Sequence, residues 1–303
     1  MEEELISNQY VIMIVTGIIM GTIARFSTIK EDYRQYPSYP NGYMIHVLTS
    51  FVAAFLGAVA IPALMTKNYV AVTFLALAIQ QFRDIRKIEK ESMQDLENTE
   101  YTYRGDAYID GIAKTFEARN YFSLLVAFAT SLTMQVMDSK WIWLNVGSGC
   151  TVGILILLWL KRFSKGKTVG DIATVRLGEV KVEGSELFVD EIYISNLLGT
   201  ENARTMFQNE GIAAIIEPKE NHLRITLDHF GQRQAILFEA TRAMGVKRYH
   251  FTRKEYDTGK VVITLVPVLK NPDLLKETIQ NTPLLENVKK SHSVMDTNFI
   301  GRR

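Results

Sequence analysis

The chain has 303 residues, of which 47% are hydrophobic and 22% charged, and its formal net charge is +1. This near-neutral balance argues against nucleic-acid binding, which depends on clustered lysine and arginine. The single cysteine, Cys150, excludes an intrachain disulfide, so nothing indicates an oxidising compartment. The average conceals a division near residue 165, where long apolar runs give way to the pattern of a soluble domain, and the length itself suggests two domains.

Five apolar stretches before residue 165 approach the roughly 20 residues that a helix needs to cross a bilayer. They are residues 10–26, Tyr43–Met65, Tyr69–Phe82, Tyr121–Met137 and Trp141–Leu160. The connections after the second and fourth stretches are only three residues long, so each makes its flanking helices an antiparallel hairpin. We therefore expect a multi-pass α-helical membrane domain over residues 1–165, with about five transmembrane helices and two cytoplasmic loops.

The basic residues of the connecting loops predict the orientation. Lys67 and Lys140 lie on one side, whereas fourteen basic residues lie on the other. These are Arg25, Lys30, Arg34, Arg83, Arg86, Lys87, Lys90, Arg104, Lys114, Arg119, Lys161, Arg162, Lys165 and Lys167. Because positively charged loops stay in the cytoplasm, we expect an inner-membrane protein with its N-terminus outside and its C-terminal domain in the cytoplasm.

Small residues recur within the apolar stretches at the spacing by which membrane helices pack. The pairs are Gly17 and Gly21, Ala53 and Gly57, and Gly149 and Gly153. Lipid gives apolar helices no hydrophobic reason to associate, so close approach of backbones at such pairs holds them together. We expect these pairs to pack the helices of one chain.

The two cytoplasmic loops are the candidate functional parts of this domain, because loops on a rigid scaffold commonly carry function. The first loop, "STIKEDYRQYPSYPNGY", combines two prolines with Arg34, Tyr36 and Tyr39. The second begins with a charged segment of helical period and continues as "YRGDAYIDGIAK". We read this stretch as a short juxtamembrane helix that packs Tyr108 against other protein, with Gly111 permitting close contact.

The hexapeptide "YIDGIA", Tyr108 to Ala113, resembles the signature of the YIEGIA family, membrane proteins of endospore-forming Firmicutes. The order of features is also similar: a membrane block with a tyrosine–proline loop, then a soluble region. Asp110 stands where the family name has glutamate, which shortens the reach of the carboxylate by one methylene. The resemblance implies a role in sporulation, with a link to regulated proteolysis as one form of it.

Beyond residue 165 the pattern predicts a cytoplasmic α+β domain over residues 166–282, followed by a flexible tail over residues 283–303. Short strands with turns at Gly178 and Gly184 come first. Two β–α–β units are expected next: residues 187–197, 201–210 and 212–218, then residues 222–228, 232–244 and 247–253. Thr200 is the expected N-cap of the first helix, and Gly245 ends the second. Two such units predict a ferredoxin-like βαββαβ sandwich, with residues 260–268 as a further strand and residues 271–280 as a helix.

We expect no cofactor and no metal, because no glycine-rich phosphate loop or paired-histidine helix occurs in the sequence. His222, His229 and His250 fall on or beside predicted adjacent strands, but scattered histidines are more often surface or core groups than zinc ligands. No carboxylate lies at the centre of a predicted span, which argues against a transporter or a proton relay. Asp106 and Asp110, at the membrane surface, are the candidate catalytic pair of an alternative reading as a novel membrane protease.

The favoured reading is a regulatory or scaffold protein, not an enzyme, that sits in the lipid bilayer and docks a protein partner at its cytoplasmic face during sporulation. The predicted partner-binding residues are Arg34, Tyr36, Tyr39, Tyr108, Asp110 and Gly111. Asp110 is expected to receive a cationic group of the partner or to pair with Arg34 or Arg104. The competing interpretation is that the hexapeptide only braces the third and fourth membrane helices.

Overall fold

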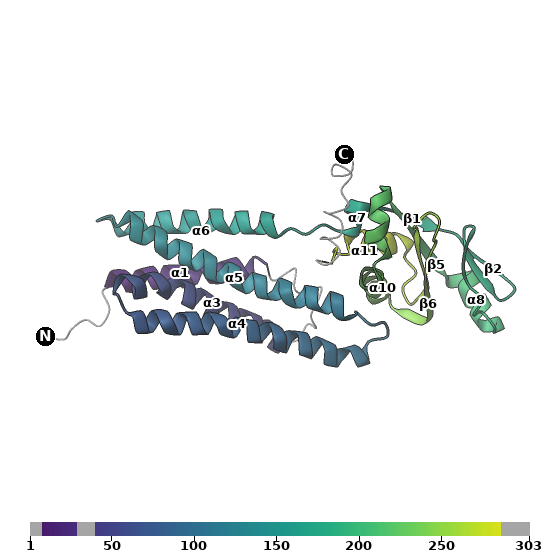
Figure 1. Cartoon of the computed structure of the whole chain (residues 1–303), viewed down its shortest axis with the longest axis horizontal. Coiled ribbons are helices and arrows are strands. Elements are labelled where there is room, and N and C mark those ends of the chain that lie inside the picture. The colour runs from purple at the N-terminus through teal and green to yellow at the C-terminus, as the bar shows by residue number, and fades with distance from the viewer. Residues whose placement is uncertain (1–7, 29–39, 286–303) are drawn as a thin grey trace, which may run out of the picture. The chain divides into compact units, whose positions relative to one another are not determined.

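The computed structural model describes residues 8–28 and 40–285 and divides the chain into two compact units (Figure 1). The first unit takes the chain up to Glu91 together with Ile112–Lys165. The second takes Ser92–Gly111 together with the chain from Gly166 onward. The second unit thus draws residues from both sides of the boundary expected at residue 165, and the chain passes between the units at three points.

Long helices form the described part of the first unit. They are α1 (Asn8–Phe26), α3 (Pro40–Met65), α4 (Tyr69–Leu96), α5 (Asp106–Met137) and α6 (Ile142–Ser164). Within the described residues, α1, residues His46–Met65 of α3, and α6 are long and apolar enough to cross a membrane. The other two expected spans are the apolar parts of α4 and α5, whose remaining turns carry many charges. The described residues thus contain three such helices where the sequence predicts five spans.

Close helix contacts in the first unit occur at the small residues that the spacing indicates. A methyl group added to Gly21 would lie 2.6 Å from the Ala54 Cβ, and one added to Gly57 would overlap the Leu124 carbonyl. A methyl group on Gly149 would lie 2.7 Å from the Met134 Cγ. The prediction that small residues pack the helices of one chain is confirmed at these positions, because side chains there would separate neighbouring backbones.

The described part of the second unit contains two antiparallel sheets. Strands β1 (Ala173–Gly178), β5 (Ile212–Pro218), β7 (Val261–Pro267) and β6 (Val246–Lys254) form the larger sheet in that order. Strands β2 (Val180–Glu183), β3 (Glu186–Val189) and β4 (Ile192–Ser195) form the smaller one. The helical elements of this part are η1 (Glu97–Thr99), α7 (Val169–Ile172), α8 (Glu201–Glu210), η2 (Asn221–Leu223), α9 (Arg224–Asp228), α10 (Phe230–Met244) and α11 (Pro272–Asn281).

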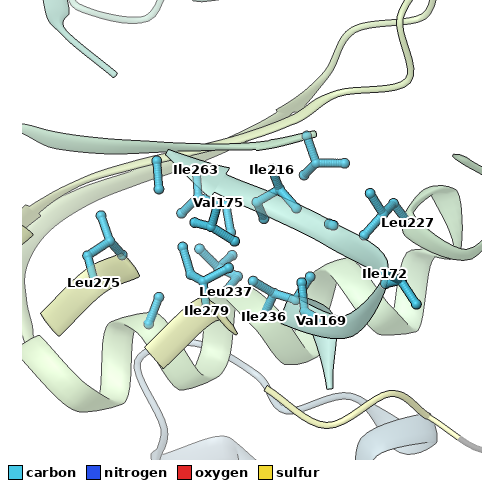
Figure 2. Close-up of a cluster of buried hydrophobic side chains, with 14 of the residues drawn as sticks. Val169, Ile172, Val175, Ile216, Leu227, Ile236, Leu237, Ile263, Leu275 and Ile279 are labelled. Carbon is cyan, nitrogen blue, oxygen red and sulfur yellow. The ribbon is translucent and has the colours of Figure 1, made fainter. Parts of the chain in front are cut away.

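Both faces of the larger sheet are buried, which explains why β5 and β7 read as unbroken apolar runs. Alternate side chains of a strand point to opposite faces. Ile216 and Ile263 therefore face the helical layer and pack with Ile236 of α10 and Ile279 of α11 (Figure 2). Ile215 faces the other way. On that face it joins a second cluster with residues of the smaller sheet and α8: Leu187, Val189, Ile194, Ala203 and Phe207.

The expected ferredoxin-like sandwich has no support in the structure. Residues 187–197, predicted as one strand, form the β3–β4 hairpin of the smaller sheet. Residues 222–228, also predicted as a strand, are helical in η2 and α9, where Leu223 and Leu227 point into the core. A single β–α–β unit remains: β5, α10 and β6, whose parallel strands are separated by β7.

Several local predictions for the second unit are confirmed. The Thr200 side chain accepts a hydrogen bond from the Ala203 amide at 3.3 Å and so caps α8. Gly245 ends α10 with a φ of +65°, a conformation that favours glycine. The strand expected at residues 260–268 is β7, and the helix expected at residues 271–280 is α11. Of the predicted tail, Leu284 and Leu285 are buried, and residues 286–303 lie outside the described residues.

Candidate functional site

The approach to α5 is a tightly folded turn that ends at Gly105. The Arg104 guanidinium pairs with Glu100 at 2.7 Å, and the Arg104 amide donates to a Glu97 carboxylate oxygen at 2.7 Å. The Gly105 carbonyl accepts hydrogen bonds from the Tyr108 and Ile109 amides, and its φ of +82° is one that glycine adopts without strain. Local contacts therefore fix where α5 begins.

The residues around this turn are part of the second unit. We call Tyr101–Gly111 the docking segment, because it lies against α10 and the edge strand β6 of that unit. The Tyr108 hydroxyl donates a hydrogen bond to the Glu239 carboxylate, and the Tyr108 ring meets the Phe238 ring edge-on with centroids 6.2 Å apart. Tyr108 and Glu239 are only 3% and 8% exposed, so the hexapeptide tyrosine is buried against α10.

Further contacts surround this pair. The Arg104 guanidinium lies over the Phe238 ring at 5.1 Å, a cation–π contact between buried groups. The Gln234 side-chain amide donates to the Tyr103 carbonyl. At Gly231, an added methyl group would lie 2.9 Å from the Ala107 Cβ. The start of α5 thus approaches α10 closely where α10 has no side chain.

Tyr101 extends the contact to β6. Its hydroxyl donates to the Arg248 carbonyl, and its ring lies edge-on to His250 with centroids 5.7 Å apart. Burial lowers the pKa of His250 below its usual value, because the charged imidazolium would lose its hydration there. The segment therefore caps one backbone carbonyl on an edge strand of the larger sheet.

The hexapeptide is divided between the two units. Tyr108, Ile109, Asp110 and Gly111 belong to the second unit, and the two residues that follow belong to the first. Ile109 is fully buried and Asp110 half-buried. Among the described residues, the nearest atom to a methyl group added at Gly111 would be the Leu285 Cδ2, at 4.0 Å.

Within the first unit, the buried α5 residue Phe116 lies among polar groups. Its ring centroid is 4.7 Å from that of His46 and 5.3 Å from the Arg25 guanidinium carbon. One turn further along α5, the Asn120 side chain accepts a hydrogen bond from the Ser50 hydroxyl at 3.0 Å. These contacts join α5 to α1 and α3 through polar as well as apolar side chains.

The remaining predicted site residues fall in different places. Arg34, Tyr36 and Tyr39 lie outside the described residues. Asp106, in the first turn of α5, is exposed and accepts a hydrogen bond from the Gln94 side chain at 2.7 Å. Arg104, one of the two expected partners of Asp110, pairs with Glu100.

Only one of the three histidines that were expected on or beside adjacent strands lies on a strand. His222 lies in η2, His229 immediately precedes α10, and only His250 is on a strand. Within residues 8–28 and 40–285, no group of three or more histidine, cysteine, aspartate or glutamate side chains has the geometry of a metal site. The three histidines could converge on a zinc ion only if residues 222–228 formed a strand, and these residues are helical.

Sequence reasoning missed the residues of α10 that hold the docking segment, Gln234, Phe238 and Glu239. A signal for them exists in the stretch "AILFEA", residues 235–240, in which Glu239 is the only polar residue, and the structure buries all six. A helix that is apolar around its whole circumference must be covered on more than one side. The sheet covers one side of α10, and the segment supplies the second cover.

Comparison with known proteins gives the same family as the hexapeptide. The family model described as "YIEGIA protein" matches residues 13–295. A relative from Bacillus subtilis (strain 168), "Uncharacterized protein YphB", is 33% identical over 300 residues, which cover 97% of each chain. No solved structure matches the chain.

Proposed function

We propose that this chain, which belongs to the YIEGIA family, is an integral membrane protein that acts as a regulatory scaffold and presents its C-terminal unit to a protein partner in the cytoplasm. The observation that carries the proposal is the path of the chain between its units. A soluble domain that is only tethered to a membrane anchor needs one linker. This chain instead passes between the two units three times, after residues 91, 111 and 165. Three connections between the units, in place of one linker, support a scaffold role.

The proposed topology has five membrane spans, with the N-terminus outside and the C-terminal unit inside. Three apolar helices, the two three-residue connections and the excess of basic residues on one side support it. The test is thiol labelling of single-cysteine variants in a Cys150→Ser background. Lys67→Cys and Lys140→Cys should react with a membrane-impermeant maleimide in intact cells, and Lys165→Cys only after permeabilisation. Labelling of Lys165→Cys in intact cells would overturn the orientation.

The proposed partner surface comprises the first cytoplasmic loop, with Arg34, Tyr36 and Tyr39, and the hexapeptide positions Asp110 and Gly111. Support comes from the amphipathic tyrosines of that loop and from the half-buried position of Asp110 and Gly111. Tyr36→Ala should abolish co-purification of the partner from cross-linked membranes of sporulating cells. Tyr69→Ala, a matched change on the side proposed to face outward, should retain it. Equal recovery of the partner with both variants would contradict the proposed docking role.

The sporulation context comes from the family resemblance and is proposed on that ground. Deletion of the protein should lower the yield of heat-resistant spores, and the Tyr36→Ala variant should reproduce that loss. A membrane protease acting through Asp106 and Asp110 is the alternative, and the exposed Asp106 with its Gln94 hydrogen bond gives it no specific support. If Asp106→Asn and Asp110→Asn leave the abundance of every protein affected by the deletion unchanged, proteolysis by these residues is excluded.

A further inference from the structure

We propose that the docking segment, Tyr101–Gly111, is an intrinsic part of the C-terminal unit, and that the surface formed by α10 and β6 is its binding site. The hexapeptide tyrosine then serves this intramolecular contact instead of an external partner. This inference does not depend on the docking of another protein, because it concerns how the chain holds its own C-terminal unit.

The first argument is the match between the segment and its binding site. Two side chains of the segment meet complementary groups of α10: the Tyr108 hydroxyl meets the Glu239 carboxylate, and the Arg104 guanidinium meets the Phe238 ring. The Tyr101 hydroxyl satisfies a carbonyl of β6. Side-chain hydrogen bonds to a charged group and a cation–π contact are specific in geometry, so a different segment would not fit equally well.

The second argument is burial. Phe238 is 2% exposed although it lies outside the core cluster that α10 forms with the larger sheet. Its neighbour Glu239 is 8% exposed, and a buried carboxylate without its donor is strongly unfavourable. Removing the segment would uncover Phe238 and leave Glu239 without the Tyr108 hydroxyl. Tyr108 is therefore a positioning residue of the C-terminal unit.

The contact itself can be tested by cross-linking within the full-length protein. A methyl group added at Gly105 would lie 3.9 Å from the Gln234 Cβ, which is within the range for a disulfide. In a Cys150→Ser background with a protease site inserted after Gly166, oxidised Gly105→Cys/Gln234→Cys should keep the two cleavage fragments joined. Gly105→Cys/Arg242→Cys is the matched control. Arg242 lies eight residues further along α10, about 12 Å away, so this pair should not join.

A second route avoids the backbone strain that cysteine would meet at Gly105, where φ is +82°. A photo-cross-linking amino acid in place of Tyr101, whose side chain is 57% exposed, should attach to the β6 residues around Arg248 and His250. Mass spectrometry of the cleaved protein locates the attachment. If neither the disulfide nor the photo-cross-link joins the fragments, the proposal is overturned.

The role of Tyr108 is tested by trypsin cleavage after Arg104, which is 6% exposed when the segment is bound. Initial rates are measured on purified full-length protein relative to cleavage after the exposed Lys140. Tyr108→Phe should raise the relative rate at Arg104 about tenfold, since protease attack follows the population of the released state. Glu239→Gln, which keeps an acceptor, should raise it less. Tyr103→Phe, whose ring is 58% exposed, should leave it unchanged.

Two results decide the outcome. An increase confined to Tyr108→Phe and Glu239→Gln supports the assignment. A wild-type rate at Arg104 for both variants, or cleavage of the wild-type protein at Arg104 as fast as at Lys140, overturns it. If Tyr36→Ala does not affect recovery of the partner, the proposed docking role fails, but the cleavage rates at Arg104 do not change. The two proposals can therefore be tested independently.

Discussion

The Tyr108 hydroxyl donates a hydrogen bond to the Glu239 carboxylate, 131 residues further along the chain. Tyr108 opens the hexapeptide and Glu239 lies in the middle of α10, so the contact joins the sequence signature of the family to the core of the C-terminal unit. Both side chains are at least nine-tenths buried. A charge-assisted hydrogen bond between buried groups contributes more than an exposed one.

A double-mutant cycle should show strong coupling between these two residues. Tyr108→Phe alone should lower the free energy of unfolding by about 1.5–3 kcal/mol, because it leaves the Glu239 carboxylate without this donor. Once Glu239→Ala is present, Tyr108→Phe should cost much less, giving a coupling energy above about 1 kcal/mol by urea unfolding of the purified protein. The control cycle pairs Tyr103→Phe with Glu239→Ala. A coupling energy of zero in both cycles would contradict the contact.

Gly231 should be replaceable only if Ala107 becomes smaller. Gly231→Ala places a methyl group 2.9 Å from the Ala107 Cβ, so the docking segment must move away from α10. We expect tryptic cleavage after Arg104 to accelerate several-fold. Adding Ala107→Gly should restore protection, although glycine in the first turn of α5 costs about 0.5–1 kcal/mol of helix stability. Protection in Gly231→Ala alone, equal to wild type, would show that the approach is looser than the structure has it.

The sequence predicts the parts of the fold that depend on local pattern. The helix boundaries at Thr200 and Gly245, the turn at Gly184 and the strand β7 follow from capping chemistry, a glycine turn signal and an unbroken apolar run. Gly178, expected in a turn, is instead the last residue of β1. Residues 222–228 mislead because "HLRITLD" alternates like a strand, yet Leu223 and Leu227 are spaced for one face of a helical turn. Strand and helix are distinguished here only by the hydrophobic core against which Leu223 and Leu227 pack.

The contact of the hexapeptide with α10 is beyond local reasoning. The pattern of Tyr108 and Ile109 indicates burial against protein, and that part is observed. Which protein surface covers them depends on a pairing between residues far apart in the sequence, here Tyr108 with Glu239 and Tyr101 with Arg248. No periodicity encodes such a pairing. The largely apolar stretch of α10 indicates only that a second cover is needed.

Gly57 and Gly147 should respond oppositely to the same substitution. A methyl group on Gly57 would overlap the Leu124 carbonyl, so Gly57→Ala must force α3 away from α5. A methyl group on Gly147, which faces outward on α6, has no atom of the described residues within 4 Å. Gly57→Ala should lower the melting temperature of the detergent-solubilised protein by several degrees, the response to about 1–3 kcal/mol of overpacking. Gly147→Ala should leave it unchanged or raise it slightly, and a fall equal to that of Gly57→Ala would contradict the packing.

Acid should weaken the second unit through the carboxylates around Arg176. Its guanidinium contacts Asp190 at 2.5 Å and Glu217 at 3.0 Å, and hydrogen bonding to Arg176 is the main cause that lowers the pKa of both carboxyl groups. Lys260, 3.2 Å from Glu217, adds to the effect. Arg176 lies on β1 and Asp190 follows β3, so these contacts also join the two sheets.

The sign of the pH dependence follows from these lowered values. In the unfolded chain the two carboxyl groups take up protons near their ordinary pKa values of 3.8 and 4.5, whereas in the folded protein they do so only at lower pH. The contribution to stability is therefore fully present above about pH 4.5 and is lost as the pH falls through the folded pKa values. Because all three side chains are partly exposed, the loss should not exceed about 1 kcal/mol. Urea unfolding from pH 7 to pH 3 should show a shallower decline in Arg176→Met than in the wild type. Arg242→Met is the control, because Arg242 is an exposed arginine. A parallel decline in the wild type and in Arg176→Met would show that other groups cause the acid sensitivity.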